Sequence, residues 1–147
     1  MDITDIKILN ILGADSRTAV KDISEKVNLS APAVKERINK MISTGLIREF
    51  TTILEPHLLG KTLTAFMFLT LRRPEKSEKF FEIIEEEKDV LSCYYLTGDF
   101  DYMIQIVTHD SESLEKMISK LRLSQEFSRT RTIIVLSTIK EKHSVAP

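Results

Sequence analysis

The spacing of the apolar residues changes at Gly45, and this change constrains the fold more than any other feature of the chain. Before Gly45, apolar residues recur every three to four positions, which is typical of helices that bury one side. After it, residues 62–72 alternate between the two sides of a strand. The chain is therefore expected to be α+β, with a helical N-terminal part and a mixed C-terminal part.

Three short helices are predicted in the first 45 residues. The first follows Thr4, a suitable N-cap, and ends at Gly13. The second is short and is expected to be capped by Thr18. Only a turn of three or four residues separates it from the third, and this is the spacing of a helix–turn–helix.

The third helix has the clearest pattern. Ser30 is expected to cap it, Pro32 fits its first turn because no intrahelical N–H is needed there, and Gly45 suits the position after its end. Four apolar residues form a stripe that should face the core of the helical part: Val34, Ile38, Met41 and Ile42.

The second half of the chain predicts a split βαββαβ unit of the ferredoxin-like kind. An extended linker strand over residues 49–61 precedes it, closed by Pro56 and Gly60. The expected elements are strands over residues 62–72, 90–97, 100–108 and 129–139, with one helix that starts at Pro74 and another that Asp110 caps. The predicted domains are therefore residues 1–48, a linker over 49–61, and residues 62–147.

Both helices of such a unit cover the same side of the sheet, so the other side is left bare. In the first strand Phe66 and Phe68 lie on that side, opposite Leu63, Ala65 and Met67. A sheet with two apolar sides needs cover on each. We expect a second copy of the chain to supply it in a symmetric dimer; the alternative is a monomer in which the linker covers the two phenylalanines.

Composition excludes several classes of protein. The 147 residues include 21 Lys and Arg and 22 Asp and Glu, and 42% are apolar, which argues against disorder and against a general nucleic-acid coat. No apolar tract is long enough to span a membrane, and the acidic N-terminus has no secretory pattern, so a cytoplasmic protein is expected. Neither the single cysteine, Cys93, nor the scattered residues His57, His109 and His143 predict a disulfide, a metal site or a nucleophile.

The outer side of the third helix suits contact with DNA. Small residues at its start allow close approach to a groove, Asn39 can read a base edge, and Lys35, Arg37 and Lys40 can meet phosphates. The Ser30 hydroxyl and the first amides of the helix can also hold a phosphate. A plain three-helix packing unit with a solvated charged face explains the same periodicity equally well.

A family resemblance distinguishes the two interpretations. The segments Asp2-Ile3-Thr4-Asp5-Ile6-Lys7-Ile8-Leu9, Asp15-Ser16-Arg17, Leu29-Ser30 and Gly45-Leu46-Ile47 resemble the DNA-binding half of the Lrp/AsnC (feast–famine) regulators. Gly98-Asp99-Phe100-Asp101-Tyr102 and Thr130-Arg131-Thr132 resemble motifs of their second half. The resemblance covers nearly the whole chain. Val20 departs from it, because many members carry a small polar residue there.

The resemblance implies a non-enzymatic transcriptional regulator with a winged-helix-like helix–turn–helix and a ferredoxin-like domain of the RAM type. Its partners would be an inverted-repeat operator in double-stranded DNA, an amino-acid effector, and further copies that form dimers and then tetramers or octamers. The candidate DNA-binding residues come from the cap, the start and the outer side of the third helix, and they are Ser30, Ala31, Ala33, Lys35, Glu36, Arg37, Asn39 and Lys40. The implied effector residues are Gly98, Asp99 and Asp101, with Asp110, Thr130 and Thr132 as weaker candidates.

Three alternatives remain open at this point. Asp99 and Asp101 have the residue type of a simple Asx-type hairpin turn. Sirohaem decarboxylases resemble the same family but have lost DNA binding, and the cationic third helix weighs against that enzyme. An architectural protein that wraps DNA with little sequence preference is the third alternative. No cofactor is predicted for the regulator.

Overall fold

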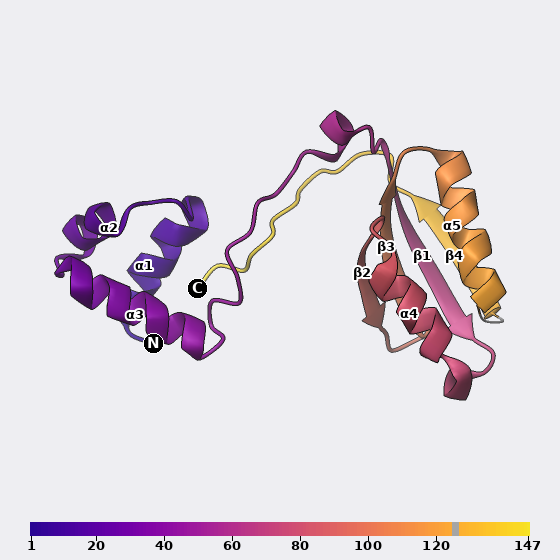
Figure 1. Ribbon diagram of the computed structural model, residues 1–147, viewed down its shortest axis with the longest axis horizontal. Helices are drawn as coiled ribbons and strands as arrows, with labels where there is room; N and C mark the ends of the chain where they lie inside the picture. Colours follow the sequence, from indigo (N-terminus) through magenta and orange to yellow (C-terminus); the bar gives the residue numbers. More distant parts are fainter. Residues whose placement is uncertain (125–126) are drawn as a thin grey trace. The chain divides into compact units, whose positions relative to one another are not determined.

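The computed structural model describes residues 1–124 and 127–147. The chain forms two compact units, one of residues 1–53 with 140–147 and the other of residues 54–139, and each is described here by itself (Figure 1). None of the described helices is long and apolar enough to cross a membrane.

The N-terminal unit is built from three helices, as the sequence predicts. They are α1 (Ile3–Ala14), α2 (Val20–Val27) and α3 (Ala31–Ser43). Each contributes to one small core because each carries an apolar stripe at helical spacing. The fully buried side chains of that core are Ile8, Ile23 and Val34, and Met41 is almost fully buried.

Two predicted helix starts are wrong. Asp2, not Thr4, caps α1, because its carboxylate accepts the Asp5 N–H while the Asp5 carboxylate accepts the Asp2 N–H, both at 2.9 Å. The Thr18 hydroxyl does not cap α2: it donates to the Asp15 carbonyl at 2.8 Å, and α2 begins after Ala19 without a side-chain cap. At α1 the Asp2 carboxylate is the better-placed acceptor, whereas at α2 the Thr18 hydroxyl is engaged as a donor to Asp15.

The ends of the other helical segments are closer to prediction. Ser30 caps α3 by accepting the Ala33 N–H at 3.4 Å, and Gly45 follows the helix with φ +75°, which favours glycine. The end of α1 lies one residue beyond Gly13. Ile42 is not a core residue, since 44% of its surface is exposed; it lies 100° round the helix from Met41.

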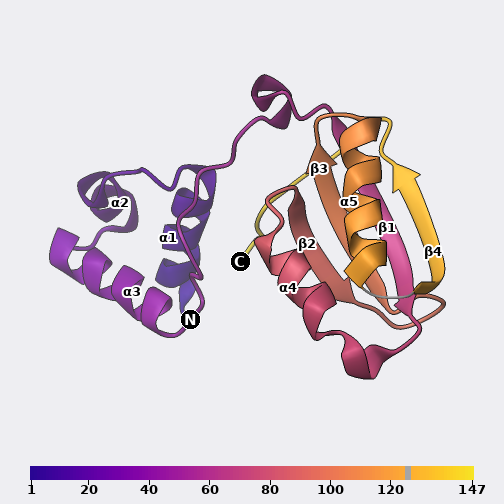
Figure 2. The same cartoon turned by 45° about the vertical axis from the view of Figure 1, so that its right-hand side comes forward.

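The C-terminal unit has the predicted βαββαβ order. Its strands are β1 (Leu63–Leu71), β2 (Val90–Tyr95), β3 (Tyr102–Thr108) and β4 (Phe127–Ile134), and its helices are α4 (Glu78–Glu86) and α5 (Ser111–Ser124). The strands form one antiparallel sheet in the order β2-β3-β1-β4 (Figure 2). Pro74 starts a separate 3₁₀ turn, Pro74–Lys76, rather than α4 itself.

Strand lengths follow from pairing. The last strand was predicted to reach Ile139 but ends at Ile134, which pairs with Ala65 near the start of β1. One further hydrogen bond joins the Val135 N–H to the Thr64 carbonyl, one residue from the start of β1 at Leu63. β2 and β3 are likewise shorter at the ends that face each other, where residues 96–101 form the connecting turn.

The linker over residues 49–61 is not a strand in the single chain. It has no regular structure before the 3₁₀ helix Pro56–Leu59, in which the Glu55 carboxylate accepts the His57 N–H at 3.2 Å. Gly60 ends that helix with φ +75°. A strand requires a second strand to pair its N–H and C=O groups, and none lies beside this segment in the described chain.

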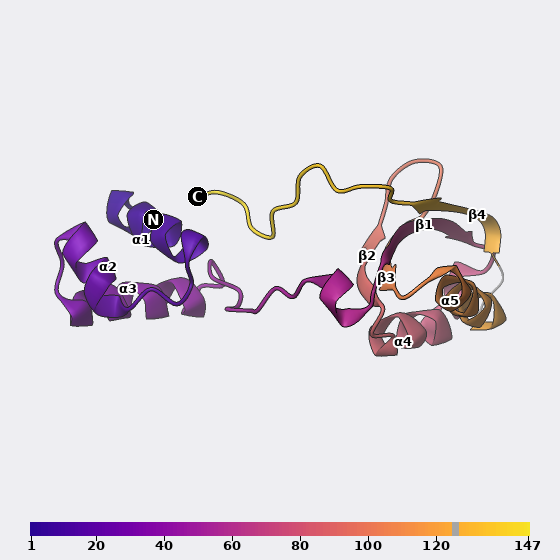
Figure 3. The ribbon, with the colours of Figure 1, turned by 90° about the horizontal axis from the view of Figure 1, so that it is seen from above.

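Both helices lie on one side of the sheet, and the other side carries no helix (Figure 3). The covered side holds the main core, whose fully buried members include Met67, Leu69 and Phe80. By the register, Phe66 and Phe68 lie on the uncovered side, level with Gln105 and Met103 of β3 and with Ile133 and Arg131 of β4. The sequence prediction of an apolar strand side without a helix over it is confirmed. We call this surface the open sheet side.

Candidate functional site

The start of α3 presents small residues beside a cap. Pro32 lies in the first turn, Ala31 and Pro32 are exposed, and Ala33 is half-buried. The Ser30 oxygen already accepts the Ala33 N–H, so its hydroxyl hydrogen is the group left to meet a phosphate. The turn before it includes Asn28, which has the left-handed conformation that ends α2. The geometry is that of a helix–turn–helix in which the second helix begins with small side chains.

Beyond the first turn, α3 exposes polar and charged side chains. Lys35, Glu36, Asn39 and Lys40 are all exposed, on the side away from Val34 and its core partners. In the part of the chain that the structure describes, neither lysine forms an ion pair. These cations are therefore available to an anionic partner such as a phosphate backbone.

Arg37 differs from the other predicted DNA contacts. Its Nη1 atom lies 2.7 Å from a carboxylate oxygen of Asp2 and 2.7 Å from one of Asp5. The guanidinium thus joins α3 to the capping box of α1. Arg37 has a structural role in the free protein, which the sequence analysis missed because the partners lie 35 and 32 residues away.

This contact lowers the pKa of both carboxyl groups. For each one the largest cause is the backbone N–H donated by the other residue of the capping box, and the hydrogen bond from Arg37 comes next. Both interactions favour the ionised form. The capping box and the ion pair are therefore one charged network at the N-terminus of α1.

The turn between β2 and β3 is fixed by backbone hydrogen bonds. The Asp101 N–H donates to the Leu69 carbonyl at 3.1 Å, and its carbonyl accepts from the Leu96 N–H at 2.7 Å. Gly98 has φ +119°, and no atom lies within 4 Å of the position that a Cβ would take. The turn is therefore a firmly anchored loop with open space at its tip, and we call residues 98–101 the effector loop.

A residue outside the predicted set contacts this loop. Arg129 of β4 donates from Nη1 to the Asp99 carbonyl at 3.2 Å, and its guanidinium carbon lies 4.9 Å from the centre of the Phe100 ring. Phe100 in turn lies 5.8 Å from Phe68, measured between ring centres. In the sequence, only the position of Arg129 directly before Thr130 pointed to a role at this loop. A single arginine in a strand has no spacing pattern that predicts a ligand contact.

The remaining effector candidates lie in two different places. Thr130 pairs with Leu69, whose carbonyl accepts the Asp101 N–H, so Thr130 lies level with the effector loop. Thr132 follows two residues along the strand. Asp110 lies beyond the opposite end of β3, where its carboxylate accepts the Ser113 N–H at 2.8 Å and caps α5. That hydrogen bond lowers the pKa of Asp110. Within one chain the structure does not bring Asp110 to the loop.

The histidines and the cysteine form no shared site. Nδ1 of His109 lies 2.9 Å from the Gly60 carbonyl, and burial raises the pKa of the half-buried Cys93 thiol, which disfavours the reactive thiolate. Among the described residues, no group of three or more His, Cys, Asp and Glu side chains is placed to hold a metal ion.

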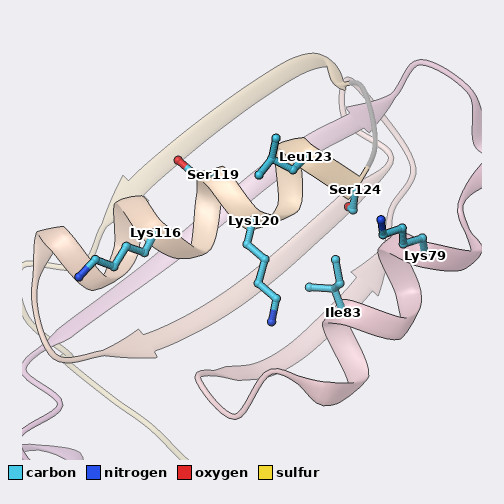
Figure 4. A pocket seen from close by; sticks show the side chains of 7 residues that line it. All are labelled: Lys79, Ile83, Lys116, Ser119, Lys120, Leu123 and Ser124. Carbon is cyan, nitrogen blue, oxygen red and sulfur yellow. The ribbon is translucent and has the colours of Figure 1, made fainter.

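A shallow depression lies between α4 and α5 (Figure 4). Its lining includes the apolar side chains of Ile83 and Leu123 and three lysines, Lys79, Lys116 and Lys120. Lys116 and Lys120 are paired within the chain, at 2.7 Å from Glu112 and 3.0 Å from Glu87. None of the predicted DNA-binding or effector residues lines this depression.

The chain was compared with protein families and with curated relatives. Residues 1–48 match a winged helix-turn-helix DNA-binding family model, and residues 64–145 match that of the Lrp/AsnC ligand binding domain. The chain is 31% identical over 141 residues to the HTH-type transcriptional regulator FL11 of Pyrococcus abyssi, covering 96% of this chain and 93% of the relative. It is 31% identical over 147 residues to the leucine-responsive regulatory protein of Escherichia coli strain K12, covering 97% and 89%.

Solved structures show the same fold. One is a transcriptional regulator of Neisseria meningitidis in complex with L-methionine, with a TM-score of 0.90, 29% identity, and coverage of 99% of this chain and 96% of that one. Another is the feast or famine regulatory protein of Mycobacterium tuberculosis in complex with L-methionine, with a TM-score of 0.90, 25% identity and 99% coverage of both chains.

The chain therefore belongs to the Lrp/AsnC family of transcriptional regulators. It is a DNA-binding regulator with a helix–turn–helix at its N-terminus and a ligand-binding domain of the ferredoxin-like fold after it. The family resemblance and the fold class expected from the sequence are confirmed.

The charged network at the N-terminus of α1 generates a pH prediction. The folded pKa values of Asp2 and Asp5 lie below the ordinary value of 3.8, so their stabilisation is fully present above pH 3.8 and is lost as the pH falls through the folded values. Asp2→Asn should lower the melting temperature of α1–α3 at pH 7 and flatten its decline between about pH 5 and 2. The NMR amide signals of these helices measure both effects.

Glu25→Gln is the matched control, because Glu25 is exposed on α2 and has no ion-pair partner in the described chain. It should leave the pH profile of the helices unchanged. An Asp2→Asn profile that overlies that of the unmodified protein would show that the network does not stabilise the unit.

Proposed function

We propose that this regulator binds an inverted repeat in double-stranded DNA through α3 and that an amino acid held at the effector loop changes its DNA affinity. The observation that carries the proposal is the exposed side of α3, where Asn39 lies between cations without ion-pair partners in the described chain and the helix starts on small residues. The proposed domain roles are DNA binding for residues 1–48 and effector binding and assembly for residues 62–147, joined by residues 49–61.

The DNA contacts divide by chemistry. Lys35 and Lys40 are assigned to phosphates, and so is Ser30 with the first amides of α3, while Asn39 and Glu36 face base edges. Ala31 and Ala33 permit close approach. Arg37 contacts DNA only if it leaves its ion pairs with Asp2 and Asp5. We therefore assign it a smaller contribution to DNA binding than Lys35 and Lys40.

The effector assignment is supported by the carboxylates of the effector loop and by relatives that bind an amino acid. Two relatives of the same fold are known in complex with L-methionine. An amino acid has an ammonium group that needs an anion, and Asp99 and Asp101 supply carboxylates on an anchored loop with open space at Gly98. Thr130 and Thr132 pair with Leu69 and Met67, so their hydroxyl groups lie on the helix-covered side of the edge strand β4 and serve a ligand only where it extends round that edge. Asp110 is excluded from the same site within one chain, and only a second copy could bring it close.

The assembly is proposed to start with a symmetric dimer through the open sheet side. Phe66 and Phe68 are only half-buried there, Ile133 is 42% exposed and Tyr94 is 52% exposed. A second copy would cover these side chains with its own, because a two-fold interface matches a surface with itself. Two α3 helices related in this way read half-sites about 34–36 Å apart, which is why the operator is expected to be an inverted repeat.

The effector acts by shifting an equilibrium. It changes DNA affinity only to the extent that it binds one arrangement of the copies more tightly than another. Tetramers or octamers of the dimer would supply such arrangements. The chain acts in the cytoplasm by binding rather than by catalysis, in keeping with relatives that are named as transcriptional regulators.

Lys40→Ala tests the phosphate assignment. Removing one phosphate contact should weaken binding to all duplexes alike and reduce the slope of log K against log salt concentration by about one. Fluorescence anisotropy at four salt concentrations measures the slope. Lys116→Ala, which removes an exposed lysine of α5, should leave the slope unchanged, and an unchanged slope in Lys40→Ala would remove that residue from the interface.

Phe68→Asp tests the dimer. A carboxylate in the middle of the open sheet side would be buried without a partner, so the variant should sediment as a monomer at micromolar concentration. Leu123→Asp adds the same charge at an exposed site of α5, on the helix side, and should remain dimeric. A Phe68→Asp protein that stays dimeric places the interface elsewhere.

Asp101→Asn tests the effector site. A thermal-shift screen of the twenty amino acids should identify at least one that raises the melting temperature of the unmodified protein, and Asp101→Asn should lose most of that shift while binding DNA normally without effector. Loss of the ammonium partner is the reason. Glu115→Gln, an exposed α5 variant, should keep the full shift. A full shift in Asp101→Asn would place the ammonium elsewhere.

A further inference from the structure

The effector loop has two carboxylates but no cation of its own. An amino acid bound there would have its ammonium group satisfied by Asp99 or Asp101, and its carboxylate would meet further negative charge. A site for a zwitterion needs both signs close together. Arg129 of β4 is a cation in direct contact with this loop.

The guanidinium of Arg129 is positioned by the effector loop but keeps N–H groups that can bind a ligand. One N–H donates to the Asp99 carbonyl at 3.2 Å, and the described chain offers the group no other hydrogen-bond acceptor. A guanidinium has five N–H donors in a planar fork, and the unused ones match the two oxygens of a carboxylate. The side chain is exposed, so a ligand can reach it.

Phe100 gives the arginine a defined position. Its ring lies 4.9 Å from the guanidinium carbon and 5.8 Å from the Phe68 ring, so the cation rests on a fixed aromatic surface. Such stacking orients a planar guanidinium and weakens its hydration less than full burial would. A lysine at this position would keep the charge but not the fork or the stacking.

We propose that Arg129 binds the carboxylate of the effector while the loop carboxylates bind its ammonium group, so that the site selects free amino acids over their amides and over simple amines. This inference rests on the proposed function and adds its carboxylate-binding residue. The specificity follows from the two charge pairs. A ligand without a carboxylate leaves Arg129 without an anionic partner, and a ligand without an ammonium group leaves Asp99 and Asp101 without a cationic one.

A purely structural role for Arg129 predicts something different. If the arginine only fastens Asp99 and Phe100, replacing it weakens every ligand of the loop to the same extent, whether or not that ligand has a carboxylate. A double-mutant cycle between the residue and the ligand group separates the two roles, because only a direct contact makes the two losses non-additive.

The experiment measures dissociation constants by isothermal titration calorimetry for the unmodified protein and for Arg129→Gln. The ligands are L-methionine and L-methionine amide; if another of the twenty amino acids binds more tightly, that amino acid and its primary amide replace them. The unmodified protein should bind the acid about 10- to 100-fold more tightly than the amide, as for a charge-assisted hydrogen-bonded pair. Arg129→Gln should bind the two about equally, and Arg129→Lys should recover part of the preference.

Arg122→Gln is the matched control, since Arg122 is an exposed arginine of α5, on the side of the sheet away from the proposed dimer interface, and has no contact with the effector loop in the described chain. It should keep the preference for the acid, with sedimentation confirming its assembly state. A preference of Arg129→Gln equal to that of the unmodified protein overturns the assignment of Arg129 alone. If none of the twenty amino acids binds the unmodified protein, the proposed effector function fails and this inference with it.

Discussion

The two apolar sides of one four-stranded sheet are the constraint on which the rest of the molecule depends. Helices α4 and α5 bury one side, and their core is complete within the single chain. The other side carries Phe66, Phe68 and Ile133 and no helix, so in water it remains only partly covered. Burying such a surface is favourable by roughly 25 cal/mol per Å². A second copy removes it from water on both chains at once, and the same two-fold axis then supplies the pair of recognition helices that an inverted repeat requires.

The effector loop is connected to this sheet by short, rigid contacts. The Asp101 N–H is bonded to the inner strand β1 through the Leu69 carbonyl, and Phe100 packs against Phe68 of the open sheet side. A ligand bound to Arg129 and Asp101 therefore contacts groups that pack against Phe100 and, through it, against Phe68 of the proposed interface between copies. This continuity gives a physical route from effector binding to assembly, without any contact between the effector and DNA.

Periodicity predicted most of the fold and part of the site. The stripe through Val34 and Met41 and the alternation of β1 are local patterns, and the structure confirms the elements they predicted. The capping box of Asp2, the ion pairs of Arg37 and the contact of Arg129 with Asp99 depend on which acceptor lies nearest in space, and spacing along the chain does not contain that information. Asp110 shows the same limit: its residue type suited both a ligand contact and a helix cap, and the structure shows the cap, while the ligand contact stays a prediction. The prediction of a strand in the linker was wrong because a strand requires a partner strand, and the described part of the single chain places none beside residues 49–61.

The most direct test is the stoichiometry of the DNA complex. Sedimentation equilibrium of the full chain with a duplex carrying one inverted repeat from the promoter of its own gene, at about 50 mM salt where phosphate contacts are strong, measures how many chains bind per site. A symmetric dimer should bind as an even number of chains, two or a multiple of two, with the two half-sites protected alike. One chain per duplex, or no binding to any such duplex at this salt concentration, would show that the protein does not bind DNA as a symmetric dimer.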